Sequence, residues 1–240
     1  MKTIGLIGGM SWESTALYYR HINRRVAERL GGLHSARCIV HSLDFAEIAA
    51  MQRAGEWTRA GGVLADAARA LQAAGASVLG IATNTMHKVA DAVEAAVDVP
   101  LLHIADVAGR ALRAAGIRRT GLLGTRFTME QDFYRERLAR HGIETVVPDA
   151  EARAEIDRVI FAELCRGDIR EDSRARYRAV VAALAADGAQ GVLLGCTEIC
   201  MLLGAGDGGL PLFDTTALHA DALVEAAFAR EPAPHAALTA

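Results

Sequence analysis

The chain contains an internal repeat at a spacing of about half its 240 residues. Residues 75–85 (GASVLGIATNT) align with residues 188–198 (GAQGVLLGCTE), and this alignment places Thr83 on Cys196 at an offset of 113. Two further blocks keep the order and nearly the same offset: residues 4–11 match residues 120–126 loosely at 116, and residues 99–104 match residues 210–215 at 111. The repeat predicts a duplicated domain of about 110 residues per copy.

A duplicated α/β domain sets two equivalent loop ends face to face across a cleft, so Thr83 and Cys196 are expected on opposite sides of one substrate. Short apolar runs alternate with longer amphipathic stretches, a pattern typical of parallel sheets covered by helices. Strands are predicted near residues 2–7, 37–43, 77–82, 100–103, 119–123, 143–147, 190–194 and 211–213. Helices are predicted near residues 14–30, 57–74, 85–96, 104–115, 129–141, 150–165, 171–187 and 216–229.

The predicted fold class is therefore α/β, with two pseudosymmetric domains, each a parallel sheet flanked by helices. The first domain is expected to comprise residues 1–103 and 214–240, and the second residues 104–213. The active site is expected in the cleft between the two domains.

The composition argues against several kinds of partner and cofactor. A formal net charge of −3 offers no cationic surface for nucleic acid, and no apolar stretch is long enough to span a bilayer. The four cysteines show no paired framework, which favours reduced thiols and a cytoplasmic location. Lys2 and Lys88 are the only lysines, and neither position suits a pyridoxal phosphate Schiff base, so no cofactor is predicted.

Three polar turns follow predicted strands at their carboxyl ends, where parallel α/β sheets bind ligands. They are residues 8–15, 83–85 and 196–198. Cys196 precedes a predicted helix, whose dipole and free N–H groups would favour the thiolate and lower the pKa. Glu198 could accept or orient the thiol proton, or serve only as a favourable charge at the helix start. Cys200 lies one turn after Cys196, but no further ligand completes a tetrahedral set nearby, so no metal site is predicted.

Together these segments resemble the aspartate/glutamate racemase family, within the broader aspartate/glutamate/hydantoin racemase superfamily. The resemblance covers essentially the whole chain and is carried, in order, by residues 8–15 (GGMSWEST), 83–88 (TNTMHK) and 194–199 (LGCTEI). It implies a cofactor-independent racemase with an acidic amino acid clamped between two α/β domains. In that family a thiol on each domain faces one side of the substrate α-carbon; one removes the proton and the other returns a proton on the opposite face.

The sequence departs from the family pattern at Thr83, where a Cys-Asn-Thr motif is usual, while Cys196 fills the second position. An unassisted threonine hydroxyl is a far weaker base than a thiolate at neutral pH. The resemblance is closest to a subgroup with threonine and cysteine as its pair. It implies that L-aspartate or L-glutamate is handled asymmetrically in rate, although no enzyme alters the equilibrium between enantiomers.

The other polar residues of the three turns are candidates for binding the substrate. Asn84, Thr85 and Thr197 are placed to hydrogen-bond the α-carboxylate with help from backbone N–H groups. Met10 and Ser11 are expected to line the turn of the first domain.

Two further groups have alternative interpretations. Gln52 and Arg53 are the candidates for the side-chain carboxylate of the substrate, and the resemblance favours Gln52; the alternative for both is a solvated helix face. His87 and His103 are candidates for shuttling protons, although a lone histidine near a helix start is more often a capping or surface residue.

Three functions fit these observations. The first is an aspartate or glutamate racemase, and the intact Asn84-Thr85 pair favours it. The second is a superfamily decarboxylase of malonate-type acids in which Cys196 protonates a carbanion, and carbon dioxide release would indicate it. The third is a non-catalytic binder of acidic amino acids. The sequence leaves open the choice between aspartate and glutamate and the oligomeric state, with a homodimer among the alternatives.

Overall fold

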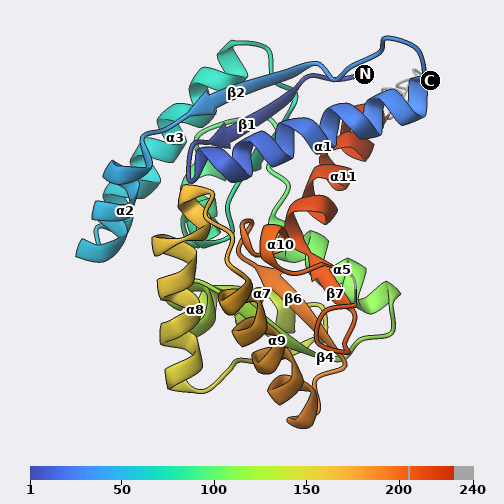
Figure 1. The fold of residues 1–240 in the computed structure, drawn as a ribbon. Helices are drawn as coiled ribbons and strands as arrows, with labels where there is room; N and C mark the ends of the chain where they lie inside the picture. Colours follow the sequence, from blue (N-terminus) through green and yellow to red (C-terminus); the bar gives the residue numbers. More distant parts are fainter. Residues whose placement is uncertain (205, 230–240) are drawn as a thin grey trace, which may run out of the picture.

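The computed structural model describes residues 1–204 and 206–229 and contains two parallel β-sheets flanked by helices (Figure 1). The first sheet has the order β2-β1-β3, formed by β1 (Ile4–Gly8), β2 (Cys38–Ser42) and β3 (Val78–Ile81). The second has the order β5-β4-β6-β7, formed by β4 (Arg119–Gly124), β5 (Glu144–Val146), β6 (Gly191–Gly195) and β7 (Leu212–Asp214). The predicted α/β class with two helix-flanked parallel sheets is confirmed.

The internal repeat maps onto equivalent strands of the two sheets. β1 and β4 each lie between the strand that follows them in sequence and a later one, β3 or β6. Leu79 of β3 forms an isolated parallel bridge with Leu101, and Val192 of β6 pairs with Leu212 of β7. These residue pairs are related by the sequence offsets of 113 and 111. The duplication therefore extends to strand register, although the strand predicted near residues 100–103 is reduced to a single bridge.

Helices cover both faces of the first sheet and connect the second sheet to it. The first sheet carries α1 (Trp12–Leu30), α2 (Phe45–Ala54), α3 (Trp57–Ala73), the 3-10 helix η1 (Thr85–Val89) and α4 (Ala90–Glu94). The later helices are α5 (Ile104–Ala114), α6 (Arg126–Glu130), α7 (Asp132–Ala139), α8 (Ala150–Ala162), the 3-10 helix η2 (Leu164–Arg166), α9 (Glu171–Ala186), α10 (Ile199–Leu202) and α11 (Thr215–Phe228).

Four of these elements differ from the prediction. The helix expected at 85–96 is divided into η1 and α4, and the helix expected at 129–141 is interrupted at Gln131, whose backbone is extended. The helix expected to reach residue 165 ends at Ala162 and is followed by η2. α2 was not predicted, although Asp44 caps its first turn and Gly55 ends it in the left-handed conformation.

Alternate residues of the central strands face opposite helical layers, as strand geometry requires. In β4, Leu122 packs with residues of α5 and α7, whereas Leu123 packs with residues of α8 and α9. In β1, Leu6 packs with α1 and α11, and Ile7 packs with α3. Burial on both faces explains why these strands read as continuous apolar runs.

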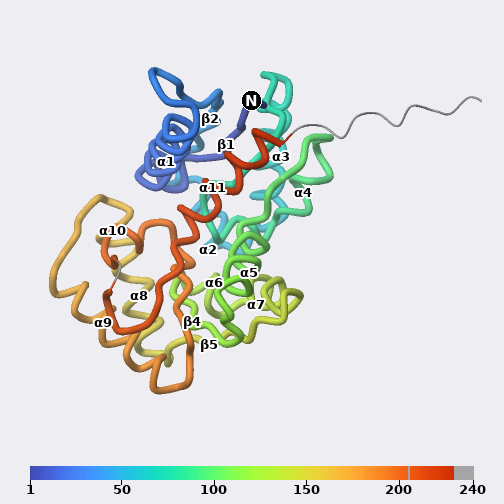
Figure 2. The backbone as a smooth tube through the Cα atoms, turned by 90° about the vertical axis from the view of Figure 1, so that its right-hand side faces the viewer, coloured from blue at the N-terminus to red at the C-terminus, as the bar shows by residue number. Residues whose placement is uncertain are grey.

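The last helix, α11, leaves the second sheet and returns to the first (Figure 2). Its Leu223 approaches Gly80 so closely that a Cβ on Gly80 would lie 2.7 Å from the leucine side chain. The assignment of residues 214–240 to the first domain stays a prediction, as do the other boundaries, and residues 230–240 lie outside the described part of the chain.

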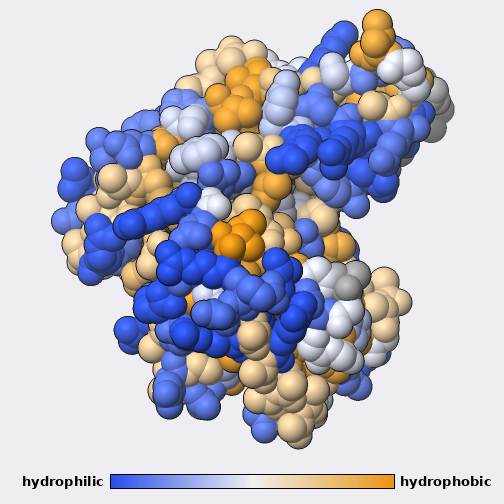
Figure 3. Space-filling model, in the orientation of Figure 1, coloured by the Kyte–Doolittle hydropathy of each residue, from blue (hydrophilic) through white to orange (hydrophobic). Residues whose placement is uncertain are grey.

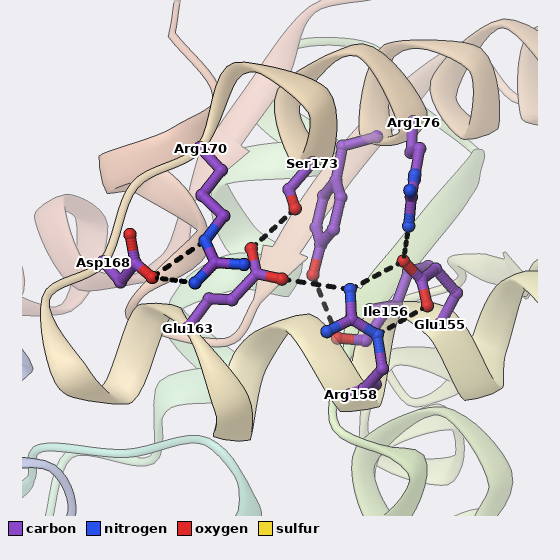
Figure 4. Close-up of polar contacts among 9 residues, drawn as sticks. Glu155, Ile156, Arg158, Glu163, Asp168, Arg170, Ser173 and Arg176 are labelled. Atoms are coloured by element: carbon purple, nitrogen blue, oxygen red, sulfur yellow. Dashed lines mark hydrogen bonds and ion pairs between the residues drawn. The ribbon is translucent and has the colours of Figure 1, made fainter.

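Helices α8 and α9 are joined by a polar network (Figure 4). Buried Glu163 accepts hydrogen bonds from Ser173 Oγ at 2.6 Å and from Arg158 Nη2 at 3.0 Å. Arg158 also pairs with Glu155, which Arg176 contacts from α9. In the view of Figure 3, hydrophilic residues gather over α8 and α9, and a smaller apolar area lies between the two halves of the molecule.

No helix among the described residues is both long and apolar enough to cross a membrane.

Candidate active site

Turns from both sheets meet around one narrow cavity. Its lining residues are Met10, Phe45, Gln52, Thr83, Asn84, Thr85, Thr125, Ile160, Phe161, Cys165, Gly195, Cys196 and Glu198. The free volume is about 20 Å³, which accommodates about one water molecule but no amino acid. An adjoining cleft of about 550 Å³ shares Gln52 and Phe161 with this cavity.

Two glycines shape the first of these turns. A Cβ on Gly8 would lie 2.5 Å from the Thr15 side chain, and Gly9 has a φ of 86°. The Gly9 N–H donates to Thr15 Oγ1 at 2.8 Å, and that hydroxyl donates to the Ser11 carbonyl at 2.8 Å. Only glycine fits this close approach, which sets Met10 against the cavity and Ser11 at the N-cap of α1.

Thr83 and Cys196, the predicted catalytic pair, line the same cavity. Cys196 directly follows β6, and Thr83 lies at the equivalent end of β3. Their surroundings differ. Cys196 Sγ donates to Glu198 Oε2 at 3.0 Å, whereas the Thr83 hydroxyl has no hydrogen-bond partner among residues 1–204 and 206–229. One side of the cavity therefore has a thiol beside a carboxylate, and the other has a hydroxyl without a base.

Glu198 is a buried carboxylate that three side chains contact. Its Oε1 accepts from Ser11 Oγ at 2.6 Å, and its Oε2 accepts from Thr197 Oγ1 at 2.8 Å as well as from Cys196. Ser11 follows β1 and Glu198 follows β6, so this contact also joins the two halves of the molecule. The contact with Cys196 Sγ lets Glu198 accept a hydrogen bond from the thiol, and its catalytic role stays a prediction.

The predicted lowering of the Cys196 pKa is wrong. Burial raises the pKa of this thiol well above its usual range, and the negative charge of Glu198 raises it further. The expected helix dipole contributes little, because α10 begins only at Ile199 and is 4 residues long. Ionisation of Cys196 therefore depends on a partner that takes its proton.

Asn84 and Thr85 both line the cavity, but their side chains are partly engaged. Asn84 Oδ1 accepts from the Tyr134 hydroxyl at 2.8 Å, and Asn84 Nδ2 donates to Thr215 Oγ1 at 3.0 Å. The second Nδ2 hydrogen remains for a ligand. Thr85 Oγ1 lies 2.9 Å from the hydroxyl of Thr125, and these two hydroxyls hydrogen-bond to each other.

Thr125 is a cavity residue that the sequence reasoning missed. It follows β4 and caps the first turn of α6, and its hydroxyl lies 3.3 Å from that of Thr128. The repeat could have found it, because the offset of 116 places Thr125 on Gly9, in the turn after β1. Hydroxyls of Thr85, Thr125 and Thr128 thus form one buried group at the carboxyl ends of strands from both sheets.

Ser11 and Thr197 do not line the cavity, since both hydroxyls are directed to Glu198. Gln52 is buried rather than solvated; it lines the cavity, and its Nε2 donates to Met86 Sδ at 3.1 Å. Arg53 is exposed and lines the adjoining cleft.

An apolar wall of the cavity was also missed. Phe45 of α2 stacks on Phe161 of α8, with ring centroids 6.2 Å apart and planes 19° apart. Cys165, in η2, adds a second thiol, whose pKa burial raises above its usual range. No sequence signal pointed to Phe45, because α2 itself was not predicted.

The two histidines proposed as proton shuttles are not among the residues that line the cavity. His103 caps α5, its Nδ1 accepting from the Ala105 N–H at 3.2 Å. His87 is buried and contacts backbone through both ring nitrogens. Within the described residues, no group of three or more histidine, cysteine, aspartate or glutamate side chains could hold a metal ion.

Comparisons with known proteins match the chain to one family. The model of the Asp/Glu/hydantoin racemase family matches residues 7–223. A candidate Asp/Glu racemase from Yersinia pestis is 53% identical, with a TM-score of 0.88 over 95% of this chain and 100% of that one. An aspartate racemase homologue from Pyrococcus horikoshii OT3 is 35% identical, with a TM-score of 0.81 over 95% and 99%. Unliganded arylmalonate decarboxylase, 17% identical with a TM-score of 0.53 over 96% and 95%, shares the fold alone.

Proposed function

The chain belongs to the Asp/Glu/hydantoin racemase family, and on this premise we propose that it interconverts the enantiomers of aspartate or glutamate without a cofactor. The observation that carries the proposal is the composition of one cavity, which contains the Cys196 thiol, its partner Glu198 and the Thr83 hydroxyl. In a two-base racemisation, one group removes the α-proton and another returns a proton to the opposite face.

In the proposed reaction, the thiol proton of Cys196 passes to Glu198 as the substrate binds. This transfer leaves the net charge of the pair unchanged, so burial opposes it less than it opposes loss of the proton to solvent. The thiolate then takes the α-proton and becomes a thiol again. The electron pair remains on the substrate as a carbanion, and the Thr83 hydroxyl protonates it on the other face.

Thr83 is better suited to donate a proton than to remove one. A carbanion is far more basic than an alkoxide, so protonation by the hydroxyl is favourable, whereas the reverse abstraction has no base to assist it. The Thr83 alkoxide regains a proton from water, and the protonated Glu198 gives its proton to the hydroxide that remains, which restores the starting state of all three groups. Because the equilibrium constant between enantiomers is one, kcat/KM must be equal in both directions. The proposed asymmetry, with the L-enantiomer as the faster substrate, therefore lies in kcat and KM separately.

Binding of the substrate carboxylates is assigned to the remaining cavity residues. Asn84 and Thr85 are proposed to contact the α-carboxylate, together with Thr125. Gln52 is proposed to donate to the side-chain carboxylate. Ser11 and Thr197 are proposed to act through Glu198, to which both donate a hydrogen bond.

The test is incubation with L- and D-aspartate and with L- and D-glutamate in deuterated water, without pyridoxal phosphate. Loss of the α-proton signal by NMR and chiral analysis of the product are followed in the same samples. We expect both exchange and inversion with at least one pair, and neither with Cys196→Ala. Binding without exchange would instead indicate a non-catalytic binder. Release of carbon dioxide from a malonate-type acid would indicate the decarboxylase, which the same thiol could serve as a proton donor.

A further inference from the structure

His87 contacts the backbone on both sides of its ring. Its Nδ1 lies 2.8 Å from the carbonyl oxygen of Thr83, and its Nε2 lies 3.2 Å from the backbone nitrogen of Ile104. Thr83 ends the turn after β3, and Ile104 begins α5. One imidazole therefore links the Thr83 turn to the start of α5.

These two partners fix the tautomer of the ring. A carbonyl oxygen can only accept a hydrogen bond, so Nδ1 must carry the hydrogen. A backbone N–H can only donate, so Nε2 must be unprotonated. Burial lowers the pKa of His87 well below its usual range, with the nearby His103 as the next cause, in keeping with a neutral ring. Neither nitrogen remains available to carry a proton to a substrate.

The ring is also held from its sides. The His103 ring lies 4.6 Å from it and the His219 ring 5.8 Å, measured between centroids. His219 is anchored in turn by the Tyr18 hydroxyl and the Leu102 carbonyl, each at 2.8 Å. Packing of this kind leaves His87 little freedom to turn away from Thr83.

We propose that His87 is a positioning residue, which holds the Thr83 turn so that the Thr83 hydroxyl faces the substrate α-carbon. The Thr83 hydroxyl has no hydrogen-bond partner among the described residues, so its position depends on the backbone that carries it. His87 holds that backbone directly. The inference rests on the proposed racemase function and assigns His87 to the Thr83 face of the reaction, not to the Cys196 face.

Two substitutions test the two hydrogen bonds of the His87 ring one at a time. In His87→Asn, the amide nitrogen can take the place of Nδ1 and still donate to the Thr83 carbonyl. In His87→Gln, the amide oxygen can take the place of Nε2 and still accept from Ile104, but the bond to Thr83 is lost. Both variants replace the ring by an amide in the same buried position, so each serves as the control for the other.

The assay starts from the enantiomer that Cys196 deprotonates, in deuterated water. It measures deuterium entering the remaining substrate, which needs only the Cys196 face, and formation of the opposite enantiomer, which needs both faces. We expect His87→Gln to lower inversion about 100-fold, the effect of a displacement of about 1 Å in a catalytic group. Exchange into the substrate should change much less, and His87→Asn should retain most inversion. Equal losses of exchange and inversion, or equal behaviour of the two variants, would overturn the proposal.

A second measurement does not depend on activity or on the folding of a variant. In the parent protein labelled with ¹⁵N-histidine, NMR reports which ring nitrogen of His87 carries the hydrogen. The proposal requires a protonated Nδ1 and an unprotonated Nε2 at neutral pH. The opposite tautomer, or a charged ring, would refute it even if racemisation occurs. If the parent shows this tautomer but exchanges no α-proton, the proposed function fails, and with it the positioning role of His87 in that reaction.

Discussion

Replacing Glu198 by glutamine tests how the buried thiol is ionised. Glutamine keeps the shape of the side chain but cannot take the proton of Cys196, whose pKa is raised by burial. Loss of a positioned general base typically costs about 10²- to 10⁴-fold in rate, which corresponds to about 3 to 5 kcal/mol of barrier. We therefore expect α-proton exchange to fall by at least about 100-fold.

The effect on stability should be smaller than the effect on rate. All three partners of Glu198 are donors, so the amide nitrogen of glutamine would face a donor and lose at least one hydrogen bond. That loss costs about 1 to 3 kcal/mol, and it is partly offset because a buried carboxylate no longer has to be desolvated. Glu198 is therefore expected to matter mainly for the reaction.

The assay is α-proton exchange with L-aspartate and L-glutamate by NMR, with urea unfolding of the same variants. Glu163→Gln is the matched control, because Glu163 is equally buried but does not line the cavity. Glu198→Asp keeps a carboxylate but withdraws it from the thiol, so its activity should lie between those of the parent and Glu198→Gln. The reasoning fails if Glu198→Gln retains more than about a tenth of the parent rate, because a general base contributes more than that.

Three further changes address other parts of the account. Thr83→Cys restores a thiol on each face and should bring the forward and reverse kcat values closer together in chiral assays; an unchanged ratio would remove Thr83 from proton transfer. Gln52→Glu places a second negative charge at the substrate side chain and should raise KM about 10-fold or more with a smaller change in kcat; an unaltered KM would remove Gln52 from binding. Burial lowers the pKa of His103 to about 4 and of His219 to about 3, so the unfolded chain binds more protons than the folded one below about pH 6.5. The free energy of unfolding should therefore fall as the pH is lowered from about 6.5 toward 4, by up to about 1.4 kcal/mol per pH unit for each histidine; urea titrations that show constant stability across this range would contradict it.

The sequence predicted the fold well because its signals are local and repeated. The central strands are apolar on both faces, and the duplicated blocks keep nearly the same offset, so the two sheets could be expected from pattern alone. Elements without such a pattern were less well predicted. α2 lies outside the repeated blocks and was not predicted, although seven of its ten residues are apolar and Asp44 and Gly55 cap its ends.

The candidate site was predictable only in part, because its chemistry depends on contacts between distant segments. The position before a predicted helix suggested that Cys196 would be ionised easily. Burial, which no local pattern reveals, has the opposite effect on its pKa. The Ser11 contact with Glu198 spans 187 positions, and the stacking of Phe45 on Phe161 joins two helices from different halves. Such contacts follow from the tertiary arrangement and have no signature at either residue alone.

The proposed two-face reaction is tested most directly by the isotope content of the first product. The L-enantiomer of aspartate or glutamate is incubated in deuterated water without pyridoxal phosphate, and the reaction is stopped at low conversion. Because the Thr83 hydroxyl exchanges with solvent before each turnover, the D-enantiomer formed should carry deuterium at the α-carbon from the start. A D-enantiomer that retains the original proton would mean that one group carries it across. Failure to form any D-enantiomer from either substrate would contradict the racemase assignment itself.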